Sequence, residues 1–491
     1  MRCLVKFESA LLETLQGYLL GHPQQHERHA FLYCHIASVD GEMVYFPKQI
    51  MTFDEEAESM DQGLCHVRVD KKVLNDLYLD YMHSEYSGLI SCHSHPFEQG
   101  SVDFSSIDDA NDQRQFNYFY DELAALKERS HPECSVHMAS MVFGQNSIAA
   151  RGLERETGDF YPLQKIVAMG ETLQNIVPTN AETSGTYYDF ETLQRQELAF
   201  GREGMQRLSA QRVAIIGAGG TGSIAAEGIC RLGVQELILV DSDTLERSNL
   251  NRWQGATPAD VGEKKVAVLA RHLKRMFPDI QIDVVDEMLF SQRSVDAVKH
   301  ADLLLGCIDD NKARYFMNRI SLQYLVPYID CSSGIRVEEG QVVKLGTRLA
   351  MVIPTYTACL DCSKIEYWDE EEMSYAFSDP YTRQEAIRRK YIDTQEEIPS
   401  PAVYPLNMLS VSMLLMEVMN LFAPYKSGFY NIYANYIGFD EPTPLAADLE
   451  KRGERADGQC LICQDYAATG DSESLKNYFS DVDHTFELPA V

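Results

Sequence analysis

The sequence predicts an α/β protein of two domains, an N-terminal α+β domain followed by a doubly wound parallel sheet. Up to about residue 160, helical and strand-like segments are mixed without a regular order. From Arg212 onward, apolar strand segments alternate with helical patterns, which is typical of a parallel sheet. A chain of 491 residues with 45% apolar and 24% charged residues also has the size and composition of a multidomain globular protein.

The charge balance excludes several classes of partner. With 43 Lys and Arg against 74 Asp and Glu, the formal charge is −31. Binding to nucleic acid or to an anionic membrane surface requires clustered positive charge, so we expect neither partner. We find no uninterrupted apolar run of about 18 residues, and acidic residues interrupt the apolar N-terminal stretch. We therefore expect a cytoplasmic protein with neither a membrane span nor a signal peptide.

The N-terminal domain is predicted to span residues 1–165. Its elements are an amphipathic opening helix, strands at 30–38, 87–96 and 135–144, and a helix around 109–129. Residues 166–188 are expected to form a linker because Pro, Gly, Ser, Thr and Asn accumulate at 176–189.

The second domain is predicted at residues 189–466, followed by a weakly ordered acidic tail at 467–491. Strands are expected at 212–217, 236–241, 280–285, 301–307 and 327–332, and helices at 223–232 and 264–276.

A histidine pair in the first domain is typical of a metal site. His93 and His95 follow an apolar strand, and residues i and i+2 of a strand face the same side. Asp108 follows in a Ser-x-x-Asp element that begins at Ser105, with Asp109 as an alternative ligand. Two imidazoles, one carboxylate and a water would form an open zinc site of the catalytic type.

This pattern resembles the JAMM (JAB/MPN) metalloproteases, which carry a glutamate, then His-x-His-Pro, then Ser-x-x-Asp. The resemblance implies that Glu27 is the general base, ahead of Glu8 and Glu13, and that Ser105 helps to hold the oxyanion. The spacer between Pro96 and Ser105 has eight residues where the family has six. The family cleaves peptide or isopeptide bonds after ubiquitin-like C-termini.

A glycine-rich turn opens the second domain. Gly217, Gly219, Gly220 and Gly222 lie between a predicted strand and a helix, where backbone N–H groups can bind phosphate oxygens. Asp241 ends the next strand, in position to reach ribose hydroxyls. Alone, this pattern would indicate NAD binding.

Cationic residues beside the same strand ends favour a triphosphate instead. Asn249, Arg252 and Lys265 follow the second strand, and Asp309 follows a later one. Hydride transfer does not need these cations, whereas phosphoryl chemistry does. A carboxylate such as Asp309 is suited to Mg²⁺.

The ordered set resembles the ThiF/MoeB/E1 family of adenylating enzymes, which have a Rossmann-like fold, over about residues 187–465. The resemblance implies that Asp241 binds ribose, that Asn249, Arg252 and Lys265 bind phosphates, and that Asp309 coordinates Mg²⁺ with ATP. It also implies that Arg195 reaches the ATP site of a partner subunit, and hence a homodimer with shared sites.

Two Cys-x-x-Cys pairs predict a second, structural zinc site. Cys359, Cys362, Cys460 and Cys463 would supply four thiolates and leave no open position. The other eight of the twelve cysteines are most simply core residues. The same two pairs occur in the ThiF/MoeB branch.

The thioester cysteine of ubiquitin-type E1 enzymes is missing, because no cysteine lies between Cys362 and Cys460. Either the reaction stops at the acyl-adenylate or a hydroxyl replaces the thiol. Ser400, between two prolines, is our candidate for an oxyester, with Thr394 as the weaker one.

Together these resemblances imply a bifunctional enzyme that trims or removes a small ubiquitin-like protein and adenylates its C-terminus, with an E2-like protein as a further partner. Such fusions occur mainly in bacterial ubiquitin-like operons, some of them tied to antiviral defence. Three alternatives stay open: adenylation of a sulfur carrier, an NAD-dependent oxidoreductase, and a scaffold with an inactive first domain.

Overall fold

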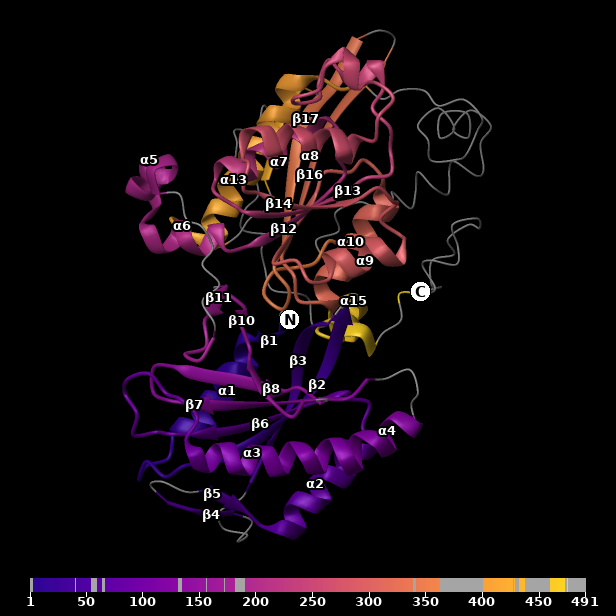
Figure 1. Ribbon diagram of the computed structural model, residues 1–491. Coiled ribbons are helices and arrows are strands. Elements are labelled where there is room, and N and C mark those ends of the chain that lie inside the picture. The colour runs from indigo at the N-terminus through magenta and orange to yellow at the C-terminus, as the bar shows by residue number, and fades with distance from the viewer. Residues whose placement is uncertain are drawn as a thin grey trace. The chain divides into compact units, whose positions relative to one another are not determined.

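A computed structural model (Figure 1) describes most of the chain. The residues outside the description are 1–2, 40, 54–59, 64–66, 131–134, 156, 172, 182–189, 339–340, 363–400, 427, 429–431, 438–459, 473–474 and 476–491. The chain divides into two compact units. Unit 1 comprises Met1–Gly185, Leu322–Leu325 and Tyr466–Asn477; unit 2 comprises Thr186–Ser321, Val326–Asp465 and Tyr478–Val491.

Unit 1 is built on a mixed sheet with the strand order β11-β10-β1-β3-β2-β6-β7-β8-β9. The bounds of these strands are β1 Cys3–Glu8, β2 His29–Val39, β3 Glu42–Thr52, β6 Gly88–Ser94, β7 His137–Phe143, β8 Ile148–Leu153, β9 Phe160–Pro162, β10 Lys165–Met169 and β11 Gln174–Ile176. A separate antiparallel pair consists of β4 (Met60–Gln62) and β5 (Val67–Val69).

Helices cover both faces of this sheet. Alternate residues of its strands point to opposite sides, and apolar residues on each side pack in a separate core. Leu32 and Cys34 of β2 pack in one core with α1 (Ser9–Leu20). Phe31 and Tyr33 pack in a second core, with the helices on the other face. Those helices are α2 Lys71–His83, α3 Ser106–Tyr118, the π-helical η1 Phe119–Ala124 and α4 Ala125–Ser130.

Three expectations for unit 1 need correction. The opening segment is not one helix, because Cys3–Glu8 forms the buried strand β1 before α1 begins. The linker expected at 166–188 begins too early, because β10 pairs with β1 and β11 pairs with β10. The tail expected from residue 467 is packed where it is described, since Ala468 is fully buried and its N–H donates to the carbonyl of Leu322.

Unit 2 contains a sheet with the strand order β14-β13-β12-β15-β16-β17-β18. The first five strands in this order are parallel to one another. Strand β17 pairs antiparallel with β16, and β18 pairs antiparallel with β17. The bounds are β12 Arg212–Ile216, β13 Glu236–Val240, β14 Gln281–Val285, β15 Leu303–Gly306, β16 Tyr328–Glu338, β17 Gln341–Val352 and β18 Ile432–Ile437. All five predicted strands are confirmed.

The helices of unit 2 complete a doubly wound arrangement (Figure 1). They are α5 Phe190–Phe200, α6 Arg202–Ser209, α7 Gly220–Arg231, η2 Arg247–Asn249, η3 Pro258–Asp260, α8 Lys265–Met276, α9 Gln292–Val298, α10 Asn311–Gln323, α13 Tyr404–Phe422 and α15 Leu461–Tyr466. The short helix η4 (Gly470–Ser472) belongs to unit 1.

The strand order reverses at β12. From this strand the chain builds outward through β13 and β14, and then returns to place β15 and β16 on the other side. Ligands of such sheets bind at the carboxyl ends of the strands beside this reversal. The turn after β12 is therefore the expected binding position.

Helix α13 is the one described helix long and apolar enough to cross a membrane. However, 67% of its apolar window is buried within the protein. Residues such as Leu414 and Val418 are fully buried, and Asn407 on the same helix accepts a hydrogen bond from Ser333. Its composition is that of a core helix of unit 2.

Candidate functional site

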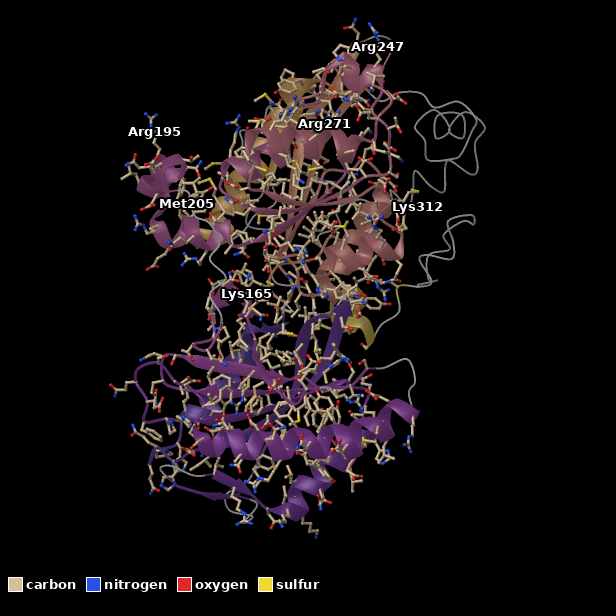
Figure 2. The ribbon with its side chains drawn as sticks, viewed as in Figure 1. Lys165, Arg195, Met205, Arg247, Arg271 and Lys312 are labelled. Carbon is tan, nitrogen blue, oxygen red and sulfur yellow. The ribbon has the colours of Figure 1, made fainter. Side chains whose placement is uncertain are left out.

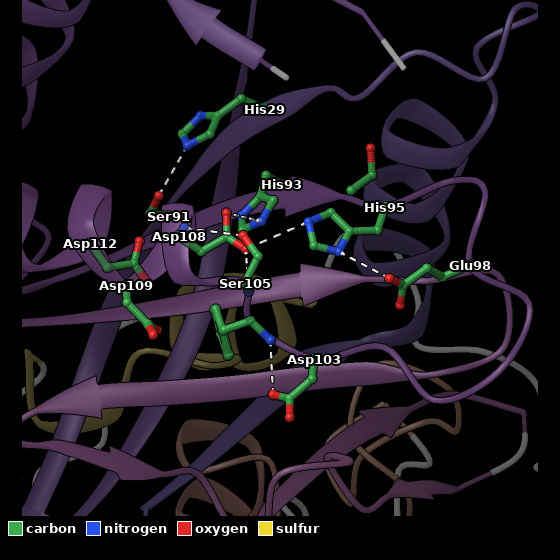
Figure 3. Close-up of polar contacts among 12 residues, drawn as sticks. His29, Ser91, His93, His95, Glu98, Asp103, Ser105, Asp108, Asp109 and Asp112 are labelled. Carbon is green, nitrogen blue, oxygen red and sulfur yellow. Dashed lines mark hydrogen bonds and ion pairs between the residues drawn. The ribbon is translucent and has the colours of Figure 1, made fainter. Parts of the chain in front are cut away.

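The histidines of unit 1 converge on one carboxylate (Figure 3). His93, in β6, places Nε2 3.2 Å from Oδ1 of Asp108, and His95 places Nε2 3.6 Å from Oδ2 of the same residue. One nitrogen or oxygen from each of the three side chains lies within 4.8 Å of the others. A tetrahedral zinc site with bonds of ~2.1 Å has ligands ~3.4 Å apart, so this cluster fits zinc.

The Ser-x-x-Asp element forms the beginning of α3. Ser105 is the N-cap residue, and its Oγ accepts a hydrogen bond from the N–H of Asp108 at 3.3 Å. In return, Oδ2 of Asp108 accepts from the N–H of Ser105 at 2.6 Å. Burial would raise the pKa of Asp108, but His93 and these hydrogen bonds hold it well below its usual range.

Asp109 does not join the cluster. Its Oδ1 lies 2.6 Å from the guanidinium of Arg151, and its side chain points away from His95 (Figure 3). Of the two aspartates weighed from the sequence, Asp108 is therefore the one positioned as a ligand.

Glu27 is buried beside this cluster, two residues before β2. Burial raises the pKa of Glu27 to about 7, while the charge of His93 opposes this effect and the charge of Asp108 adds to it. A carboxyl group with a pKa near neutrality can both accept and donate a proton at physiological pH. The other candidates lie elsewhere: Glu8 pairs with Lys48 at 3.1 Å, and Glu13 is exposed on α1.

His29 is a further residue of this region that sequence reasoning missed. Its Nε2 lies 3.0 Å from Oγ of Ser91, and burial lowers the pKa of His29 to about 3. It is a neutral side chain on β2, the strand that pairs with β6. The strand pairing of His29 with His93 could not be read from a local motif.

The glycine turn of unit 2 lies at the reversal of strand order. Gly217 has a φ of +91°, a conformation that side chains rarely adopt. A Cβ on Gly222 would lie 1.8 Å from the carbonyl oxygen of Gly217, so the helix can approach the strand only without one. Around Gly219, by contrast, no neighbouring atom of the described residues lies within 4 Å of an added Cβ. This open space at the N-terminus of α7 is where a phosphate can approach the backbone.

Asp241 supports this turn from the end of β13. Its Oδ2 accepts from the N–H of Ala218 at 2.6 Å and its Oδ1 accepts from the N–H of Asp243 at 2.7 Å. Burial raises the pKa of Asp241, and Lys265 opposes this effect. Each carboxylate oxygen keeps a second lone pair for a ribose hydroxyl.

The cationic residues lie around the same turn. The Cγ of Arg252 would be 3.0 Å from a Cβ on Gly220, and Trp253 donates to the carbonyl of Ala218 at 2.6 Å. Nζ of Lys265 lies 2.6 Å from Oδ2 of Asp243.

Two further residues predicted to bind the nucleotide or its metal, Asn249 and Asp309, lie in the segments after β13 and β15. Asn249 caps η2, where its Oδ1 accepts from the N–H of Glu246. Asp309 is exposed and follows β15, directly after the segment that would contact a Cβ on Gly217.

Arg195 lies away from this turn. It is exposed on α5 (Figure 2), and its neighbour Gln196 donates to the carbonyl of Arg231, at the opposite end of α7 from the glycines. A helix of 12 residues spans ~18 Å. Arg195 therefore does not belong to the nucleotide site of its own chain.

The two Cys-x-x-Cys pairs meet in one cluster. Sγ of Cys359 lies 3.7 Å from that of Cys362 and 3.9 Å from that of Cys460, and Cys362 lies 3.5 Å from Cys463. Zinc–thiolate bonds of ~2.3 Å give a tetrahedron with edges of ~3.8 Å, which matches these distances. Ser400 and Thr394 lie outside the described residues.

Comparison with known proteins identifies one family. Residues 193–460, more than half of the chain, match the model of the ThiF family. The SAMP-activating enzyme E1 of Haloferax volcanii is 32% identical over 145 residues, covering 30% of this chain and 53% of that protein. The sulfur carrier protein ThiS adenylyltransferase of Escherichia coli K12 is 32% identical over 161 residues, covering 33% and 61%.

A relative from Drosophila and a solved structure have lower sequence identity to this chain. Ubiquitin-like modifier-activating enzyme 5 of Drosophila willistoni is 29% identical over 192 residues, covering 37% of this chain and 45% of that protein. The crystal structure of Escherichia coli MccB with ATP has a TM-score of 0.44 and 18% identity, covering 55% and 74%. The chain thus spans about half to three-fifths of the length of these curated relatives, and by its match over residues 193–460 it belongs to the ThiF family.

Proposed function

We propose that unit 2 uses ATP to adenylate the C-terminal carboxylate of a small ubiquitin-like or sulfur-carrier protein. One observation carries this proposal: the glycine turn lies at the reversal of strand order, with Asp241 and Arg252 beside it, in a chain of the ThiF family. Relatives of this chain are named as activating enzymes and adenylyltransferases. Family membership also favours ATP over NAD as the nucleotide.

In the proposed reaction, a carboxylate oxygen of the carrier attacks the α-phosphorus of ATP. The bond from this phosphorus to the bridging oxygen breaks, so the products are an acyl-adenylate and pyrophosphate. The N–H groups at Gly219 and Gly220 would contact phosphate oxygens, and Arg252, Lys265 and Asn249 would bind the remaining charge. Asp241 would accept from the ribose. Asp309 would hold Mg²⁺.

Arg195 is proposed to act in a second copy of the chain, as part of a homodimer. Its exposure, and the position of its helix near the far end of α7, support this assignment. The test mixes two inactive variants, Arg195→Ala and Arg252→Ala. If each site draws Arg195 from the partner, mixed dimers regain part of the activity, because one of their two sites is intact. If the mixture stays inactive, the shared site is wrong.

Carrier-dependent exchange of labelled pyrophosphate into ATP tests the adenylation itself. We expect exchange only with a carrier that has a free C-terminus, and at least a 100-fold loss in Arg252→Ala, which removes a charge needed at the phosphates. Binding of NAD in preference to ATP would instead support an oxidoreductase. A thiocarboxylated carrier, detected by mass spectrometry, would indicate sulfur transfer.

A second candidate function concerns unit 1: zinc-dependent cleavage after the C-terminus of the same carrier. The convergence of His93, His95 and Asp108 beside the buried carboxyl of Glu27 favours it. A zinc ion held there would polarise the scissile carbonyl. Glu27 would take a proton from the attacking water and deliver it to the leaving amine, while Ser105 would contact the developing oxyanion.

The cleavage test uses a carrier with a short C-terminal extension. We expect trimming that a chelator abolishes and zinc restores, and that Glu27→Gln removes while the zinc content stays unchanged. A chain without zinc at this site and without trimming would indicate a scaffold. An adduct with the carrier that is labile to hydroxide and absent in Ser400→Ala would support the oxyester.

A further inference from the structure

Arg151 lies on β8 of unit 1, which β7 separates from the strand β6 that carries His93. Arg151 is 6% exposed. The Cζ of its guanidinium lies over two aromatic rings, 3.7 Å from the centroid of Phe104 and 4.0 Å from that of Phe160. A planar guanidinium held in this way has little freedom to change orientation.

This guanidinium binds two carboxylates of α3. One terminal nitrogen lies 2.6 Å from Oδ1 of Asp109, while Nε and the other terminal nitrogen lie 3.0 and 2.7 Å from Oδ2 of Asp112. Asp112 is itself buried, at 5% exposure. Removing the arginine would leave that carboxylate without its counter-charge, so the contact strongly constrains α3.

The contacts of Asp109 and Asp112 with Arg151 fix the rotation of α3 about its axis, and this rotation determines the direction in which Asp108 points. Asp108 immediately precedes Asp109, and successive residues of a helix are rotated by ~100°. Asp109 and Asp112 point away from His95, whereas Asp108 points towards the two imidazoles (Figure 3). Phe104, which stacks on Arg151, immediately precedes the N-cap residue Ser105, so the same guanidinium also restrains the chain entering the helix.

We propose that Arg151 is a positioning residue for the metal site of unit 1: it fixes the rotation of the first turn of α3, and this directs the carboxylate of Asp108 at the ion held by His93 and His95. This inference rests on the zinc site proposed above. Residues that orient metal ligands without touching the metal typically contribute ~10–100-fold to metal affinity.

The experiment measures zinc bound per full-length chain by mass spectrometry, after equilibration against buffers of graded free Zn²⁺. We expect the closed four-cysteine site to fill at lower free zinc, so that the histidine site appears as a second step. Arg151→Met is expected to shift this second step to at least 10-fold higher free zinc. Arg151→Lys keeps the charge but loses the forked contact, so its second zinc step should lie between those of the wild type and Arg151→Met.

Arg155→Met is the matched control. Arg155 also lies over a ring, 5.5 Å from the centroid of Tyr120, and also pairs with a helix carboxylate, Glu128, at 3.2 Å. It has no contact with α3 among the described residues. Its variant should leave both zinc steps unchanged, even if it lowers the unfolding temperature by as much as Arg151→Met does.

The outcomes separate the two hypotheses. Asp108→Asn removes the second zinc step if the proposed metal site exists; an unchanged step would refute that site. If Asp108→Asn removes the step but Arg151→Met leaves it unchanged in a folded protein, the positioning role is wrong and the metal site stands. If Arg151→Met fails to fold, Asp109→Ala provides the test. The carboxylate of Asp109 is half exposed, and its removal leaves no buried carboxylate without a counter-charge.

Discussion

Ser105 and Asp108 exchange two hydrogen bonds, so the pair that resembles a catalytic motif is also a reciprocal cap on α3. The same carboxylate faces His93 through its other oxygen at 3.2 Å. The carboxylate of Asp108 therefore caps α3 and also lies in the candidate metal site, and the two roles can be separated by substitution.

Replacing Ser105 by alanine should reduce the free energy of unfolding of unit 1 by ~1 kcal/mol, the usual cost of a lost N-cap. Ser105→Asn retains a capping oxygen and should restore most of this stability. If Ser105 also contacts the oxyanion, neither variant should recover cleavage. Recovery of cleavage in Ser105→Asn would show that cleavage does not require the hydroxyl itself. Thermal unfolding and the trimming assay together decide this.

Two glycines of the turn in unit 2 form a matched pair. Gly222→Ala places a Cβ 1.8 Å from the carbonyl oxygen of Gly217 and should destabilise unit 2 by about 3 kcal/mol or more. The added Cβ of Gly219→Ala has no neighbour within 4 Å in the part of the chain that the structure describes, so this variant should leave the unfolding temperature unchanged. Because this open space is where phosphate is proposed to approach, Gly219→Ala should still weaken ATP binding by 10-fold or more. Unchanged ATP affinity in a folded Gly219→Ala protein would contradict the proposed phosphate position.

The four-cysteine cluster should hold one zinc ion per chain. Cys362→Ser should lower the zinc content by one equivalent and lower the unfolding temperature of unit 2, because a closed thiolate site contributes its binding energy to folding. Cys230→Ala is the control, since this buried thiol lies outside the cluster. Its zinc content should equal that of the wild type; a loss there would mean that the cysteine variants act through misfolding.

Two histidines of unit 1, the buried His35 and the half-buried His137, should make its stability depend on pH. Burial lowers the pKa of His35 and of His137 to about 4 each. Unfolded histidine binds its proton near pH ~6.5, so between pH 6.5 and 4 the unfolded chain holds more protons than the folded one. Stability therefore falls as pH falls through this window, by ~1.4 kcal/mol per pH unit for each histidine.

His35→Gln isolates one of these contributions. Glu27, with its raised pKa, titrates in the opposite sense in the same window, so the informative quantity is the difference between wild type and variant. The wild type should lose about 1 to 2 kcal/mol more than His35→Gln between pH 6.5 and 5.0, as measured by urea unfolding. Parallel pH profiles would show that His35 is protonated in the folded protein.

Local motifs predicted much of both sites. The glycine turn, with Asp241 and Arg252, depends on residues near the ends of neighbouring parallel strands, and such ends meet at one edge of a sheet. The spacing of His93, His95 and Asp108 likewise depends on one strand and the helix that follows it. The Cys-x-x-Cys pairs could be joined because their chemistry requires four ligands.

Long-range pairing could not be predicted in this way. Strand β1 ends at Glu8, which is also the N-cap residue of α1, so no turn residue separates the strand from the helical pattern. The sequence predicts a linker where β10 forms, because its partner β1 lies at the other end of the unit's sequence. The contact of Arg151 with α3 has no local signal either, since a lone arginine in a strand is usually a surface residue.

The placement of β1 has a consequence for how the chain acquires its structure during synthesis. Strand β1 lies inside the sheet of unit 1, between β3 and β10, and the second of its two parallel partners is made only when Lys165–Met169 emerges. Such non-local pairing makes folding slow and exposes an unpaired strand edge in the meantime. Unit 1 also includes Tyr466–Asn477, which is translated after nearly all of unit 2. A ribosome-bound chain that ends before Tyr466 should therefore lack part of unit 1, so that the protection of this unit from proteolysis is incomplete until that segment is made.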